Sequence, residues 1–130
     1  MNYTLVIQGS PIASQSCQTA LGFARAALNQ GHKILRVFFL GDAVHIASTL
    51  TVPPQGEQDL HCEWKALANA HGIDLVICIS AAIKRGLVDQ QEAQRYSKPA
   101  FNIEAPFTLS GLGQLVDAAV HADRVITFGN

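Results

Sequence analysis

The sequence has few charged residues for its length. They make up 15% of its 130 residues, and hydrophobic residues make up 48%, whereas about 25% of the residues in an average soluble domain are charged. We therefore expect other subunits to cover part of its surface. Lys and Arg number 9 and Asp and Glu number 10, giving a formal net charge of -1. This balance disfavours direct binding of RNA or DNA, because no basic field is available to hold nucleic acid by counterion release.

Cysteine and long apolar runs are scarce as well. The three cysteines, Cys17, Cys62 and Cys78, are odd in number and have no CxxC spacing, which argues against a disulfide framework and against a zinc ribbon. The N-terminus begins directly with the strand-like NYTLVIQG, and no apolar run reaches the roughly 18 residues of a membrane span. We expect reduced thiols in the cytoplasm, with neither export nor a membrane span.

Several motifs of catalysis and ligand binding are missing. The sequence has no GxGxxG or Walker pattern and no GxSxG elbow, and its five histidines are scattered. We therefore expect neither a metal centre nor a hydrolase site. The loop at residues 8–16, QGSPIASQS, carries Gly and Ser and precedes a helix. A binding site for a phosphorylated ligand in this loop stays open beside its interpretation as an ordinary turn.

The sequence does contain an alternation of apolar strands and helices. Its length suits one domain, residues 1–130, which would bury about two thirds of its unfolded surface. Five apolar runs are typical of strands: residues 3–8, 33–40, 73–79, 124–128 and, more weakly, 101–107. Helical patterns separate these runs. The alternation predicts an α/β fold with a doubly wound, mainly parallel sheet of about five strands and helices on both faces.

The helix boundaries are predicted from capping residues. Ser14 or Ser16 is expected to cap the first helix, since a hydroxyl oxygen can accept from a free N–H group of the first turn. A short helix is expected over residues 43–50, and a longer one over residues 59–70. Ser80 is expected to cap a further short helix directly after the third strand.

Cys78 lies at the end of the third strand, in the stretch ICISAAIKRGLV. In doubly wound sheets, sites lie outside the carboxyl ends of the strands, near the switch in strand order. The start of a helix stabilises a thiolate more than a thiol, through its partial positive charge and its unsatisfied N–H groups. The alternative is that Cys78 is a small apolar residue of a buried strand, as free cysteine often is. Lys84 and Arg85 either raise the local positive potential or are simply solvated.

The other two cysteines are less suited to chemistry. Cys17 shares the apolar face of the first helix, so we expect it to pack in the core. Cys62 points nearly opposite to the apolar face of its helix, which carries Trp64, and is expected at the surface or at an interface.

Four long stretches of the chain carry a family resemblance: TLVIQGSPIASQ, LGFARAALNQGHKILRVFFLGDAV, EWKALANAHGIDLVICISAAIKRGLVD and FTLSGLGQLVDAAVHADRVITF. Together they cover most of the chain, which resembles the DsrE/TusD subunits of bacterial sulfur relay complexes. The resemblance implies a flavodoxin-like α/β subunit with sulfurtransferase activity. It also implies that Cys78 carries sulfane sulfur as a persulfide, a chemistry that needs no cofactor and no metal. Cys17 and Cys62 match no motif of the family.

The resemblance implies partners and a pathway. Such subunits assemble with two related small subunits, one DsrF/TusC-like and one DsrH/TusB-like, into a heterohexamer with two copies of each. A donor sulfurtransferase supplies the sulfur, and an acceptor of the DsrC/TusE type removes it. DsrE-like members serve dissimilatory sulfur oxidation, which is the pathway expected here, and TusD-like members serve the formation of 2-thiouridine in tRNA. A further alternative is a non-catalytic assembly subunit in which Cys78 is buried.

Overall fold

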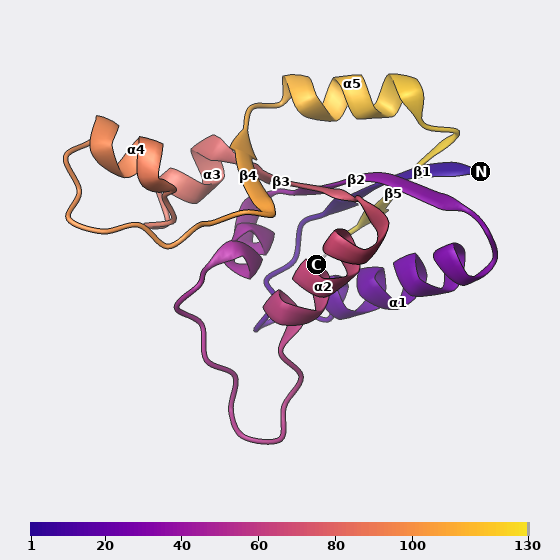
Figure 1. Ribbon diagram of the computed structural model, residues 1–130, viewed down its shortest axis with the longest axis horizontal. Coiled ribbons are helices and arrows are strands. Elements are labelled where there is room, and N and C mark those ends of the chain that lie inside the picture. Colours follow the sequence, from indigo (N-terminus) through magenta and orange to yellow (C-terminus); the bar gives the residue numbers. More distant parts are fainter. Residues whose placement is uncertain (130) are drawn as a thin grey trace.

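The computed structural model describes residues 1–129 (Figure 1). The elements follow one another as β1 (Asn2–Ile7), α1 (Ser16–Asn29), β2 (Lys33–Phe39), η1 (Gly41–Ala47), α2 (Leu60–His71), β3 (Asp74–Cys78), α3 (Ile79–Ile83), α4 (Gln90–Arg95), β4 (Phe107–Ser110), α5 (Gly113–His121) and β5 (Arg124–Phe128). The element η1 is a 3-10 helix, in which hydrogen bonds join residues three apart. Within residues 1–129, no helix is long and apolar enough to cross a membrane.

The five strands form one sheet in the order β4-β3-β2-β1-β5. Each neighbouring pair runs parallel, so every connection must cross from one end of the sheet to the other. From β1 the chain adds β2, β3 and β4 in turn on one side, and then returns to place β5 on the other side of β1. The switch in strand order therefore lies between β1 and β5. These features confirm the predicted doubly wound α/β fold, with one parallel sheet and helices on both of its faces.

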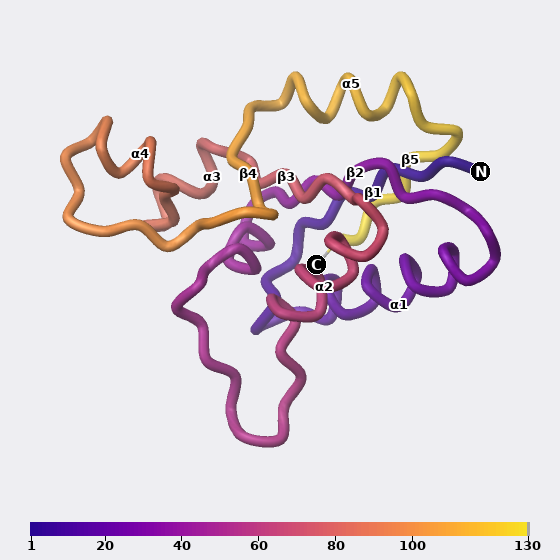
Figure 2. Tube along the Cα trace, in the orientation of Figure 1, coloured from indigo at the N-terminus to yellow at the C-terminus, as the bar shows by residue number. Residues whose placement is uncertain are grey.

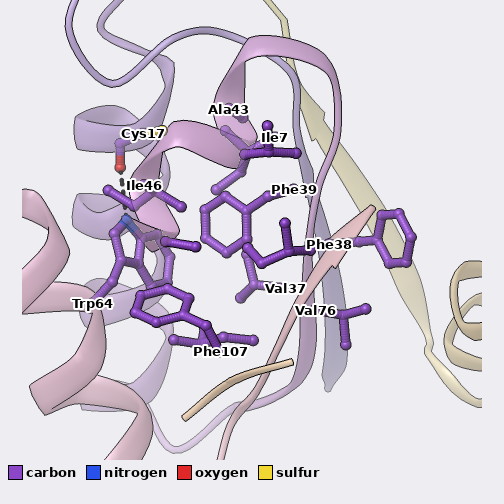
Figure 3. Close-up of a cluster of buried hydrophobic side chains, with 14 of the residues drawn as sticks. Ile7, Cys17, Val37, Phe38, Phe39, Ala43, Ile46, Trp64, Val76 and Phe107 are labelled. Atoms are coloured by element: carbon purple, nitrogen blue, oxygen red, sulfur yellow. Dashed lines mark hydrogen bonds between the residues drawn. The ribbon is translucent and has the colours of Figure 1, made fainter. Parts of the chain in front are cut away.

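The face of the sheet toward α1 and α2 holds the aromatic core. Because side chains alternate along a strand, Val37 and Phe39 lie on the side of Trp64, whereas Phe38 and Val76 lie on the other side (Figure 3). The rings of Phe39 and Trp64 meet edge to face at a centroid distance of 5.8 Å. Trp64 is fully buried and must therefore satisfy its indole N–H within the protein. Its Nε1–H donates to the carbonyl oxygen of Cys17 at 3.2 Å, and this bond joins α2 to the start of α1.

The opposite face is covered by α5, which lies across the sheet from α1 and α2 (Figure 2). Polar bonds hold this helix to the strands. The hydroxyl of Thr4 donates to the carbonyl oxygen of Ala118 at 3.2 Å, and the guanidinium of Arg36 donates to the carbonyl oxygen of Gln114 at 2.9 Å. Thr4 is completely buried, so its bond to α5 also satisfies a hydroxyl that water cannot reach.

One predicted strand was wrong. Residues 101–107 were expected to form it, but β4 begins only at Phe107 and ends at Ser110. Ile103 is buried although its backbone N–H bonds to the carbonyl oxygen of Val88 instead of to a strand. The apolar pattern of this segment therefore reflects packing of a loop. The expected position at an edge is correct, since β4 is the outermost strand beside β3.

Two local predictions in the first half of the chain also need correction. The N-cap of α1 is Gln15, whose side chain makes no capping bond within the described residues, whereas the hydroxyl of Ser14 accepts from the backbone N–H of Ser16. The helix expected over residues 43–50 is the tighter η1, which begins at Gly41 and is buried along most of its length. Both differences arise where the chain leaves a strand and turns back over the sheet edge.

Candidate active site

Cys78 is the last residue of β3 and the N-cap of α3. Its backbone is extended, with φ -60 and ψ 116, so the strand passes directly into the helix without a connecting loop. In the ladder between β3 and β4 it pairs with Ser110, which ends the edge strand. Cys78 is thus at the carboxyl edge of the sheet, as predicted. It lies on the third strand, however, and not on either of the strands that flank the switch in strand order.

The sulfur of Cys78 lies just beneath the surface. The residue is 7% exposed, and its Sγ is 3.5 Å from the Oγ of Ser80, where either atom can be the donor. Ser80 itself is exposed. The prediction that Ser80 caps the helix was wrong, because α3 begins at Ile79 and Ser80 is its second residue. Its hydroxyl instead lies within hydrogen-bond distance of the buried thiol.

Arg85 and Lys84, which follow α3, have different environments. The Nε of Arg85 is 3.0 Å from Oδ1 of Asp42 in η1, and its Nη1 donates to the carbonyl oxygen of Ala81 at 2.9 Å. The Arg85 side chain is 23% exposed. Lys84 is exposed and makes no ion pair within residues 1–129. Lys84 is therefore solvated. Arg85, by contrast, joins the segment after β3 to η1, the segment after β2, through its ion pair with Asp42.

Comparison with known proteins places the chain in a family. The DsrE/DsrF-like family matches residues 1–128. The chain belongs to this family. It is 45% identical to the DsrE protein of Allochromatium vinosum over the full length of both chains. It is 48% identical to a sulfurtransferase TusD homolog of Pseudomonas aeruginosa, over 92% of this chain and 91% of the relative.

Two further comparisons agree with this assignment. The chain is 42% identical to the sulfurtransferase TusD of Salmonella newport, over 98% of this chain and all of the relative. The crystal structure of the ychN protein from E. coli superposes with a TM-score of 0.78 at 21% identity, covering 98% of this chain and 99% of that one. At this identity the likeness supports the fold alone. The resemblance read from the sequence to DsrE and TusD subunits is therefore confirmed at the level of the family.

Cys17 and Cys62 lie where the sequence predicted them. Cys17 is fully buried, with its thiol donating to the carbonyl oxygen of Gly9 at 3.5 Å, and burial raises the pKa of this thiol from 9.0 to about 12. Cys62 is exposed on α2, and a hydrogen bond to the Asp59 carboxylate is the main cause that raises the pKa of its thiol. Both raised pKa values disfavour the thiolate, which is the form of cysteine that attacks, so neither Cys17 nor Cys62 is suited to act as a nucleophile.

The β1–α1 loop uses its polar groups internally. The hydroxyl of Ser10 accepts from the backbone N–H groups of Ile12 and Ala13, each at 3.1 Å. The N–H of Ser14 donates to the carbonyl oxygen of Ser10, and that of Ser16 donates to the hydroxyl of Ser14. In this family member the loop therefore forms a self-bonded turn, which favours the turn interpretation over a phosphate site.

A groove of about 420 Å³ opens beside the loop at residues 51–58. Its walls include Ile12, Pro53 and Pro54, together with His45 and His61. His61 is held in place by a 2.6 Å contact from its Nδ1 to the carbonyl oxygen of Ile46. Cys78 does not line this groove. Among residues 1–129, no group of three or more His, Cys, Asp or Glu side chains is placed to hold a metal ion.

Proposed function

We propose that this protein is a sulfurtransferase subunit of a sulfur relay complex and that Cys78 is the residue that carries the sulfur. Family membership supports the sulfur relay, because relatives at 42% and 48% identity are named sulfurtransferases. The position of Cys78 supports the assignment of the residue. It is the cysteine at the carboxyl edge of the sheet that also begins a helix.

The proposed reaction is the transfer of one sulfur atom between thiols. The thiolate of Cys78 attacks the terminal sulfur of a donor persulfide, R–S–SH. One sulfur–sulfur bond forms while the bond inside the donor breaks, and the donor leaves as the thiolate R–S⁻. Cys78 becomes Cys78–S–SH with no net oxidation or reduction. An acceptor cysteine then attacks the terminal sulfur in the same way and releases the Cys78 thiolate.

The surroundings of Cys78 suit this chemistry. The first-turn N–H groups of α3 follow the sulfur-bearing residue directly, and such groups stabilise an anion at a helix start. Burial to 7% exposure limits access of water and oxidants to a persulfide, which otherwise oxidises readily. Ser80 is an exposed residue whose hydroxyl is 3.5 Å from the sulfur, and it marks the side from which a partner's cysteine would approach. The reaction itself requires no metal and no organic cofactor.

The relay requires protein partners. We expect two related small subunits, DsrF/TusC-like and DsrH/TusB-like, in a heterohexamer, with a separate donor and an acceptor of the DsrC/TusE type. Exchange between free thiols needs a reducing compartment, which points to the cytoplasm. Sulfur oxidation is the expected pathway. Formation of 2-thiouridine in tRNA is the second candidate, because the identity to the TusD homolog, 48%, is as high as that to DsrE, 45%.

The proposal is tested by loading the purified protein with a sulfane sulfur donor and weighing the intact subunit. Wild type is expected to gain the mass of one sulfur atom, and Cys78→Ser is expected to gain none. Cys62→Ser is the matched control, because it removes an exposed thiol and should leave the gain of one sulfur atom unchanged. A gain that persists in Cys78→Ser would exclude Cys78 as the carrier.

A second stage of the same experiment identifies the pathway. The loaded protein is mixed with a DsrC-type or a TusE-type acceptor, and the masses of both proteins are followed with time. Sulfur should move to the acceptor of the pathway that the protein serves. If wild type takes up no sulfur, alone or with its partner subunits, the protein is an assembly subunit in which Cys78 is structural.

A further inference from the structure

The outer edge of β4 borders an open groove. β4 is the last strand of the sheet on the side of α3 and α4 (Figure 1), and the groove has a volume of about 690 Å³. Three consecutive residues of the strand line it, namely Phe107, Thr108 and Leu109. Side chains of a strand alternate between the two faces of a sheet, so a groove on one face would be lined by every second residue. The groove therefore runs along the backbone at the edge of β4.

The backbone at this edge is free to bind a further strand. Within residues 1–129, no hydrogen bond joins the backbone of residues 108–110 to a segment other than β3. The N–H and C=O groups of an edge strand that point away from the sheet can pair with an added strand. The sequence of β4 is FTLS, without the charged or proline residues that protect many sheet edges.

Glutamine side chains of α4 line the groove as well. Gln90, Gln91 and Gln94 each bring an amide group, which carries donors and an acceptor as a peptide bond does. Among the described residues that line the groove are the carboxylates of Asp89 and Glu104 and no Lys or Arg. Its hydrogen-bonding groups therefore suit an extended backbone, and its charge favours an uncharged or basic segment over an acidic one.

The edge of β4 is one strand away from Cys78. Ser110, the last residue of β4, is the ladder partner of Cys78. Neighbouring strands lie about 4.8 Å apart, so a strand added to β4 would be roughly 10 Å from β3, a distance that about three extended residues cover. Cys78 is only 7% exposed, so a cysteine on a narrow, extended chain reaches it more easily than one on a broad folded surface.

We propose that the edge of β4 binds an extended segment of the acceptor protein that takes the sulfur from Cys78, by adding this segment to the sheet as a further strand. The segment is uncharged or basic, and its cysteine lies about three residues beyond the paired part. The identity of the partner rests on the proposed function of Cys78. The inference assigns a role to the edge strand that the sulfur chemistry itself does not use.

The test is hydrogen exchange of the full chain, followed by mass spectrometry, with and without a DsrC-type or a TusE-type acceptor. Exchange in the peptide that covers β4 should slow roughly fivefold, the equivalent of one net hydrogen bond. The other edge strand, β5, is the internal control and should exchange as before. Unchanged exchange in β4, whether the acceptor binds elsewhere or neither acceptor binds, overturns the proposal.

Two proline variants test the backbone hydrogen bonds. Alternate residues of an edge strand direct their N–H groups toward opposite sides, so one of Thr108 and Leu109 has an outward N–H and the other bonds to β3. Proline is tolerated only at the outward position. Of Thr108→Pro and Leu109→Pro, the variant that keeps the wild-type stability should therefore bind the acceptor roughly three- to tenfold more weakly. Binding equal to that of wild type overturns the proposal.

Glu104→Lys tests the charge of the groove and still decides if both proline variants are unstable. Glu104 is exposed and lines the groove, so the substitution should weaken binding of the acceptor roughly two- to fivefold, and less in about 1 M salt. Glu57→Lys is the matched control, because Glu57 is also exposed but lines the groove beside residues 51–58. Equal binding by the two variants overturns the proposal.

Sulfur transfer separates this proposal from the proposed function. If Cys78 takes up no sulfur from a sulfane donor while the acceptor still protects β4, the proposed function fails and the role of the edge stands. If Cys78 is loaded and passes its sulfur on while β4 exchanges as before, the role of the edge fails alone. Protection of β4 by a second copy of the chain or by a related small subunit, without an acceptor, also overturns it, because the occupant is then another subunit.

Discussion

At the scale of single residues, three cysteines in one chain have three different environments. Cys17 is fully buried on α1, Cys78 lies just beneath the surface at the start of α3, and Cys62 is exposed on α2. Burial raises the pKa of Cys17 because a thiolate loses its hydration there, and the nearby Asp59 carboxylate raises that of Cys62. Environment rather than residue type therefore separates the candidate nucleophile from the other two thiols.

Labelling with iodoacetamide at pH 10 should separate Cys17 from Cys62. Two pH units below a pKa of about 12, about one thiol in a hundred is ionised, and Cys17 is also inaccessible in the folded protein. We expect Cys62 to react fully while Cys17 stays unlabelled, and both to react in urea. Mass spectrometry of the two peptides measures the result. Labelling of Cys17 in the folded protein at a rate close to that of Cys62 would contradict its buried placement.

The position of Cys78 was predictable from sequence, and the ion pair of Arg85 with Asp42 was not. The apolar run from Ile73 onward ends near Cys78 and is followed by small residues that suit a helix start. The pairing of Arg85 with Asp42 joins residues 43 apart in the sequence, and no local pattern reveals which distant carboxylate a cation will meet. The hydroxyl of Ser80 was assigned to a cap because Ser is a preferred N-cap residue, although the N-cap of α3 is Cys78, two residues earlier.

At the scale of elements, α2 shows how local signals define a helix. Asp59 is its N-cap, and its carboxylate accepts from the backbone N–H of Cys62 at 3.1 Å. Gly72 ends it with φ +66, in the left-handed region that glycine adopts without steric cost. Both ends agree with the predicted helix over residues 59–70 to within one or two residues. A helix with clear caps is thus readable from the sequence. The start of α1 was also placed to within one residue, but its N-cap is Gln15, which makes no side-chain cap bond, and not Ser14 or Ser16.

Asp59→Ala is expected to lower the free energy of unfolding by about 1 kcal/mol, because the Cys62 N–H loses its side-chain acceptor. Asp59→Asn keeps an acceptor oxygen and should retain most of the stability. The hydrogen bond from the Cys62 backbone is the main cause that lowers the pKa of Asp59 in the folded protein. Its charge-dependent contribution is therefore complete above the unfolded carboxyl pKa of about 3.9 and is lost as pH falls through the lower folded value.

Urea unfolding followed by the fluorescence of Trp64, the one tryptophan of the chain, measures both effects. The advantage of wild type over Asp59→Asn should decrease as pH falls below about 5 and through the lowered pKa of Asp59. If Asp59→Asn loses as much stability as Asp59→Ala at pH 7, the carboxylate or amide oxygen at this position does not cap α2.

At the scale of the whole molecule, the order of strands and helices was readable because a parallel sheet buried on both faces requires nearly continuous apolar runs. The runs in β1, β2 and β3 meet this condition. β4 does not, since Thr108 and Ser110 are polar and only Phe107 is fully buried in it. In an edge strand of four residues, the apolar pattern is too short to show where the strand begins. The buried Ile103 of the preceding loop extended that pattern and led to a strand being predicted too early in the chain.

The two faces of the sheet are stabilised differently. Aromatic packing around Trp64 and Phe39 joins α1 and α2 to one face. On the other face α5 packs through the small Ala118 and the partly buried Leu115. It is also held by polar bonds, and it presents several large apolar side chains to solvent. These exposed residues are Val116 and Val120 of the helix and Leu112, its N-cap. Because polar bonds contribute less net free energy than burial of large apolar side chains, α5 is expected to open before the rest of the sheet.

Arg36→Met tests this difference between the faces. Arg36 is 16% exposed and binds Asp74 at 3.1 Å and Asp117 at 3.5 Å, in addition to the carbonyl oxygen of Gln114. Methionine keeps the apolar stem and removes these bonds, so we expect a loss of about 1–2 kcal/mol in the free energy of unfolding. Hydrogen exchange should accelerate in α5 more than in α1 or α2.

Arg25→Met is the matched control for that substitution. Arg25 forms an ion pair with Glu63 at 3.1 Å between α1 and α2, but its side chain is 46% exposed, and such surface pairs contribute about 0–1 kcal/mol. The control should leave exchange in α5 unchanged, because the aromatic core still joins α1 and α2 to the sheet. Equal losses of stability in the two variants, or unchanged exchange in α5 of Arg36→Met, would show that packing rather than Arg36 holds α5. With the expected result, ion pairs and hydrogen bonds of Arg36 contribute to the attachment of α5 to its face of the sheet, whereas apolar packing attaches α1 and α2 to the other face.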